Sequence, residues 1–72
     1  MTLEQIVTKE RAHRVESGEF GINACKESIR FEVTQMNHTL YELLEKYVKR
    51  ANEDVFFNKA MVLACWELIN EQ

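Results

Sequence analysis

The sequence contains no proline, and its only two glycines, Gly18 and Gly21, lie close together. Proline and glycine are the residues that most often end helices, so outside this one place nothing forbids a helix. Cysteine is also scarce, with Cys25 and Cys65 alone among 72 residues. Two cysteines in a cytoplasmic protein are usually small buried hydrophobic side chains, and we expect that here rather than a disulfide.

Long apolar runs are absent as well. The longest one, residues 60–66, is far shorter than the roughly 20 residues that a membrane span needs. The first residues include Glu4 and Glu10 and lack the apolar stretch of a signal peptide, so the sequence predicts a cytoplasmic protein without a membrane segment. The net charge is −3 with both signs interspersed, which argues against nucleic acid as the main ligand.

The sequence also lacks a recognisable catalytic or metal-binding motif. His13 and His38 do not combine with the cysteines in any of the common metal-binding spacings, so no metal or cofactor is expected. Paired carboxylates such as Glu42 and Glu45 could serve acid–base catalysis, but each has a lysine four residues later, as in a solvated helix face. The sequence therefore predicts a protein that is not an enzyme.

The composition that remains is that of one globular domain over residues 1–72, with 46% apolar and 29% charged residues. Apolar residues recur at steps of three and four, which predicts an all-α bundle of three helices. The expected helices span about 2–17, 23–51 and 53–70. The first opens on a capping box in which Thr2 and Gln5 exchange hydrogen bonds, and it stops at Gly18.

Two features of this bundle favour a homodimer. A helix over 23–51 would be about 43 Å long, too long for a compact domain with a radius of gyration of about 11 Å. The helix over 53–70 is apolar on every side, which is typical of a helix covered from several directions. Its large side chains are the expected core and dimer interface: Phe56, Phe57, Met61, Trp66 and Ile69.

A second interpretation applies to the middle of the chain. Ile29, Phe31 and Val33 alternate with charged residues, which is typical of a β-strand near 29–35. Thr39 begins a second capping box, so a new helix would start there. This order of elements resembles a ribbon-helix-helix DNA-binding domain. Residues 36–52 are similar to the first helix of that family and residues 58–69 to its second, and the resemblance implies an α+β fold and a transcriptional regulator.

A basic cluster near the end of the first helix, Lys9, Arg11 and Arg14, is the best polar candidate for binding a partner. Together with the homodimer, it predicts a small non-enzymatic regulatory protein that acts through protein–protein interaction. Adaptors and inhibitors of this kind are often encoded by phages and plasmids. The alternative is the DNA-binding regulator that the ribbon-helix-helix resemblance implies.

Overall fold

The structure is a computed structural model that describes residues 1–17 and 20–72, and the side chains of residues 1–13 and 21–72. Its elements are α1 (Leu3–Ser17), α2 (Phe20–Gln35), α3 (Leu40–Glu53) and α4 (Ala60–Asn70). The described residues contain no strand. The expected all-α class is confirmed, but the expected number of three helices is wrong, and so is the alternative with a strand near 29–35.

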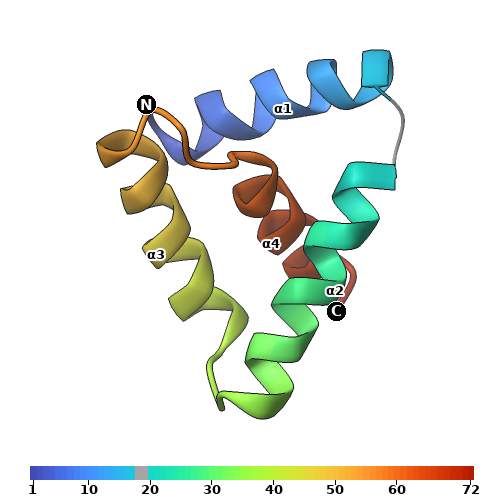
Figure 1. Cartoon of the computed structure of the whole chain (residues 1–72), viewed down its shortest axis with the longest axis vertical. Helices are drawn as coiled ribbons and strands as arrows, with labels where there is room; N and C mark the ends of the chain where they lie inside the picture. Colours follow the sequence, from blue (N-terminus) through green and yellow to red (C-terminus); the bar gives the residue numbers. More distant parts are fainter. Residues whose placement is uncertain (18–19) are drawn as a thin grey trace.

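The four helices are arranged around α4. Figure 1 shows α1 across one end of the molecule, α2 and α3 converging toward the other end, and α4 between them. Each of the other helices packs against α4, whereas α2 and α3 contact each other only slightly. The molecule extends 32 × 25 × 21 Å, with a radius of gyration of 11.4 Å.

The long helix expected over 23–51 is broken between α2 and α3. The N–H of Met36 closes the last turn of α2 on the carbonyl of Glu32, and Asn37 then adopts a φ of 57°. Asparagine is one of the few residues that enter this left-handed region without a large penalty. A straight helix over 23–51 would be about 43 Å long, which exceeds the 32 Å extent of the molecule. The chain therefore reverses at 36–39.

Thr39 starts α3 after this reversal. Its hydroxyl oxygen accepts a hydrogen bond of 3.1 Å from the N–H of Glu42, which is the N-cap that the second interpretation expected. Thr2 and Gln5 also exchange two such bonds, of 3.2 and 3.0 Å, so the capping box of α1 is confirmed. The expected stop at Gly18 lies outside the described residues.

The last helix begins later than the expected residue 53, because a loop over 54–59 precedes it. Asp54 accepts a hydrogen bond from the N–H of Phe56 through its side chain and another from the N–H of Phe57 through its carbonyl. The side chain of Asn58 likewise accepts from the N–H of Ala60. Asp and Asn side chains compete with helical hydrogen bonds in this way, so they hold the loop open until residue 60.

The core lies where α4 meets the other three helices. Val62, Leu63, Ala64 and Cys65 are consecutive and all 0% exposed, because α1, α2 and α3 cover α4 from different sides. A helix surrounded by three neighbours has no polar face, so its composition is explained within one chain. Both sequence arguments for a homodimer thereby lose their basis. None of the described helices has the length and apolar character needed to cross a membrane.

Candidate functional site

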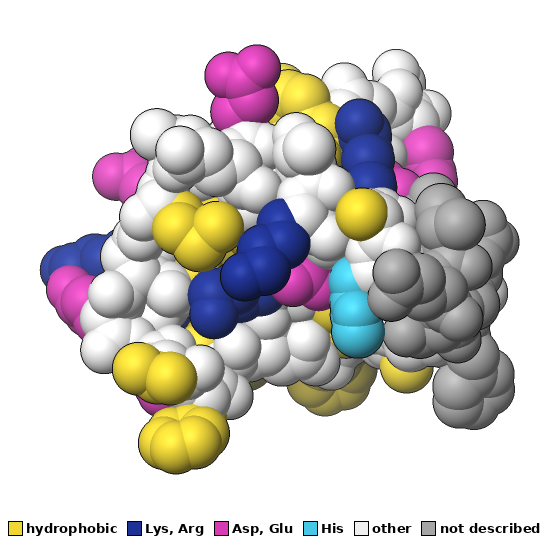
Figure 2. All heavy atoms as spheres, turned by 90° about the horizontal axis from the view of Figure 1, so that it is seen from above, with side chains coloured by type: hydrophobic (Ala, Val, Ile, Leu, Met, Phe, Trp, Pro, Cys, Tyr) yellow, Lys and Arg dark blue, Asp and Glu magenta, His cyan; other side chains and the backbone are white. Residues whose placement is uncertain are grey.

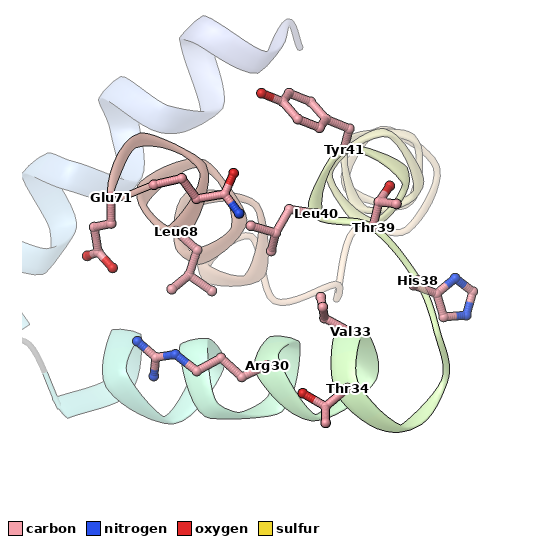
Figure 3. Close-up of a pocket in the computed structure, with 10 residues that line it drawn as sticks. Arg30, Val33, Thr34, His38, Thr39, Leu40, Tyr41, Leu68 and Glu71 are labelled. Atoms are coloured by element: carbon pink, nitrogen blue, oxygen red, sulfur yellow. The ribbon is translucent and has the colours of Figure 1, made fainter.

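An open groove of about 680 Å³ lies between the end of α2, the start of α3 and the end of α4. Figure 3 shows Val33, Leu40 and Leu68 entering this space, one from each of the three helices. The reversal over 36–39 sets α2 and α3 apart, and the last turn of α4 fills the gap between them only in part. The floor of the groove is therefore apolar and built from three separate segments.

The walls of the groove are aromatic and polar. Tyr41 lines it with 66% of its side chain exposed, a large fraction for a side chain of this size. Arg30 and Glu71 supply opposite charges, and Thr34, Thr39 and Gln72 supply hydroxyl and amide groups. An apolar floor with a few convergent polar groups is the usual composition of a binding site.

The two charged side chains on the walls, Arg30 and Glu71, each form an ion pair with a neighbouring residue. Arg30 bonds Glu27 on its own helix at 2.6 Å, in an exposed pair. Glu71 receives a hydrogen bond of 2.9 Å from Lys26, which lowers the pKa of that carboxyl below its ordinary value. The same bond raises the pKa of Lys26. The carboxyl of Glu71 is therefore held in its charged form at this wall.

Lys26 belongs to a second and more polar hollow of about 370 Å³, between α1, α2 and α4. Its ammonium group lies 3.1 Å from Glu67 and 2.9 Å from Glu71. Because Lys26 and Glu67 are both largely withdrawn from solvent, this pair fastens α2 to α4. We regard the hollow as part of the packing between helices, with Arg11 at its margin.

The predicted basic cluster is not brought together. Arg11 lines the polar hollow, whereas Lys9 lines a shallow depression with Thr2 and Thr8 on another side of α1. Residues two positions apart on a helix point in directions that differ by about 200° around its axis. Figure 2, which looks onto the end formed by α1, shows basic and acidic side chains interspersed over it. The side chain of Arg14 lies outside the described residues.

The predicted core and interface residues divide into two groups. Phe57 stacks on Tyr47 with ring centres 5.6 Å apart, and the guanidinium of Arg50 covers its ring at 4.8 Å. Half-buried side chains at the edge of the core make up the rest of this group: Met61, Trp66 and Ile69. Phe56 is the exception, because it is 95% exposed and contributes nothing to the core.

The buried reactive groups are held in unreactive states. Burial raises the pKa of Cys65 to about 12, and it raises the pKa of Cys25 as well. A thiol that stays protonated is a poor nucleophile and a poor metal ligand. The hydroxyl of Tyr47 donates a hydrogen bond of 2.5 Å to Glu32, and burial together with this bond raises its pKa. No group of three metal-ligating side chains occurs among the described residues.

The groove is the feature that sequence reasoning missed. Val33 and Leu40 belong to one apolar stripe if a single helix spans 23–51, and a continuous stripe leaves no space between them. The signal that could have located the groove was the capping sequence at Thr39, which places a helix start inside that span. No protein-family model, curated protein or solved structure matches this chain.

Proposed function

We propose that this protein is a non-enzymatic regulatory protein that binds a segment of a partner protein in the groove between α2, α3 and α4. The observation that carries the proposal is the composition of the groove, with an apolar floor drawn from three helices and an exposed aromatic wall at Tyr41. The roles of adaptor or inhibitor and the cytoplasmic setting remain predictions from the sequence.

Binding in the groove would be driven by the removal of apolar surface from water. Tyr41 is two thirds exposed on the wall of a groove whose floor includes Val33 and Leu40, so a partner side chain placed there would remove apolar surface on both molecules. Tyrosine is among the residues that contribute most to protein interfaces, because it covers a large area at a small cost in conformational entropy. Arg30 and Glu71 would then orient the segment through charged hydrogen bonds.

The size of the groove indicates the kind of segment. Sites of about 300–1,000 Å³ enclose a drug-sized ligand or a few side chains. We therefore expect one or two apolar anchors from a short helix or an extended peptide, with a polar residue that meets Arg30 or Glu71. The DNA-binding alternative depended on a strand over 29–35, and because those residues are helical we do not carry it forward.

Binding of a peptide selected from a random library tests the proposal. The fluorescently labelled peptide is titrated with the wild-type protein and with two variants, Tyr41→Ser and Phe31→Ser. Phe31 is the matched control, since it is a similarly exposed aromatic residue, at 62% against 66%, that does not line the groove. Losing a central aromatic anchor weakens binding by at least about tenfold, so we expect that loss for Tyr41→Ser and less than a twofold change for Phe31→Ser.

Two results would contradict the proposal. The first is that no selected peptide binds the folded protein, and the second is that the bound peptides respond equally to both variants. Circular dichroism and urea unfolding of each variant confirm that a loss of binding is not a loss of fold, which the exposure of both rings already favours.

A further inference from the structure

The loop between α3 and α4 presents two adjacent apolar side chains to solvent. Val55 is 84% exposed and Phe56 is 95% exposed, the highest values among the exposed large hydrophobic residues that the structure describes. Single apolar residues on a surface are ordinary, but a neighbouring pair that includes a phenylalanine is a small hydrophobic projection. We call Val55 and Phe56 the loop tip.

The loop tip is held in place by its neighbours. Asp54 fixes the turn through hydrogen bonds to the N–H groups of Phe56 and Phe57, at 2.9 and 3.1 Å. Phe57 then packs inward on Tyr47. A backbone already held in one turn loses less entropy on association, so the loop tip is suited to anchor an interaction.

The loop tip and the groove lie at opposite ends of α3. The groove is lined by Thr39, Leu40 and Tyr41 at the start of this helix, and the loop tip follows its last residue. The 14 residues of α3 span about 21 Å. Figure 1 shows α3 separating these two ends. The loop tip therefore does not reach the groove of its own chain.

The two surfaces are complementary in chemistry. The apolar pair of the loop tip matches the aliphatic floor of the groove and its wall at Tyr41. Glu53 is exposed and directly precedes the loop, and none of the ion pairs in the described part of the chain includes it. Arg30, on the wall of the groove, is half exposed and is paired only with a neighbour on its own helix in that part. A carboxylate beside the loop tip and a guanidinium beside the groove would attract each other when the apolar surfaces meet.

We propose that the loop tip of one copy of this chain binds in the groove of a second copy. This inference rests on the proposed function of the groove and names its occupant. Because the two surfaces differ and lie at opposite ends, the contact is head-to-tail, and each bound pair leaves one groove and one loop tip open. Copies therefore add one after another, and the average mass rises with concentration beyond that of a dimer.

Sedimentation equilibrium of complementary variants tests this arrangement. Phe56→Ser removes the anchor and keeps the groove, whereas Tyr41→Ser alters the groove and keeps the anchor. Both side chains are exposed, so neither variant is expected to lose its fold. Each variant alone is expected to stay monomeric up to hundreds of micromolar, whereas wild-type protein and the control Phe31→Ser form species larger than dimers. An equimolar mixture of the two variants is expected to form a 1:1 pair and nothing larger, since the pair has no working groove and anchor left to extend it.

The outcomes separate this inference from the proposed function. A wild-type protein that stays monomeric at hundreds of micromolar overturns the self-association, and the proposed function still stands if a library peptide binds in a Tyr41-dependent manner. Wild-type association that survives both single variants overturns the pairing of loop tip and groove. A mixture that fails to pair also overturns it. A mixture that forms a 1:1 pair and nothing larger supports it.

Discussion

Helices α3 and α4 differ in how much of their circumference is buried. Four consecutive residues of α4, Val62 to Cys65, are fully buried. In the four consecutive residues 43–46 of α3, Leu43 and Leu44 are buried and Glu45 and Lys46 are exposed. Four residues complete just over one helical turn, so α4 is covered all round and α3 on one side only.

This difference corrects the expectation that the last helix is covered by a second copy of the chain. A helix that is apolar all round was expected to need a second chain, yet α1, α2 and α3 of the same chain cover it. Its composition marks a central position in the fold, whether the neighbours come from one chain or two. The surfaces that remain for a partner are the groove at the start of α3 and the loop tip beyond its end.

Side-chain truncation in α4 and in α3 should give the largest expected difference in the free energy of unfolding. Leu63→Ala in α4 leaves a cavity in the centre of the fold and should lower the free energy of unfolding by about 3 kcal/mol. Lys49→Ala, on the exposed side of α3, should change it by less than about 0.5 kcal/mol. Urea unfolding followed by the fluorescence of Trp66 measures both. Equal effects would show that α4 is not the central helix.

The start of α3 depends on the left-handed residue before it. Asn37→Val places a β-branched side chain at a φ of 57°, and we expect a loss of about 1–2 kcal/mol in stability. Asn37→Gly serves as the control and should change stability by less than about 0.5 kcal/mol, because glycine adopts this conformation without strain. If the valine variant is as stable as the wild type, the reversal over 36–39 is not held by this residue.

Alkaline pH should loosen α4 through its buried thiol. The unfolded chain releases the proton of Cys65 near the ordinary pKa of 9.0, whereas burial raises the pKa in the fold to about 12. The folded protein therefore binds more protons above pH 9, and its stability falls as the pH rises, by about 1 kcal/mol between pH 9 and pH 10.

Cys65→Ala should make this pH dependence shallower, with a remainder from the other groups whose pKa is raised, Cys25, Tyr47 and Lys26. Wild type and variant are compared by the slope of the unfolding free energy against pH. The smaller side chain lowers stability at every pH, so it does not change this slope. A slope that Cys65→Ala leaves unchanged would assign the alkaline loss to other groups.

The smallest expected difference in stability is between variants that remove one or the other of two ion pairs on α2. Lys26 reaches Glu67 on α4, where both side chains are largely withdrawn from solvent, and also the more exposed Glu71, and Lys26→Met should cost about 1 kcal/mol. Arg30 reaches only Glu27 on the same exposed surface, and Arg30→Met should cost less than about 0.5 kcal/mol. Thermal unfolding at low and high salt measures both. Equal losses would mean that the contact between α2 and α4 does not depend on this bridge.

The capping sequences were the most informative local signals. Thr2 and Thr39 each start a helix through a hydrogen bond to a backbone N–H three residues later, which residue identity and spacing indicate without a structure. The length of the middle helix was not predictable from periodicity alone, because Val33 and Leu40 remain in step across the reversal. The groove followed from that reversal, so it was hidden together with it.

The sequence by itself favoured the helical class and contained the capping signals at Thr2 and Thr39, although the leading interpretation ran one helix through Thr39, because these signals depend on residues a few positions apart. Only the tertiary structure decided that α4 is enclosed by its own chain, since enclosure depends on which helices meet. It also decided that Lys9 and Arg11 line different hollows. The groove and the loop tip arose in the same way, from the reversal at Asn37 and from the turn at Asp54 that directs Phe56 outward while Phe57 packs on Tyr47.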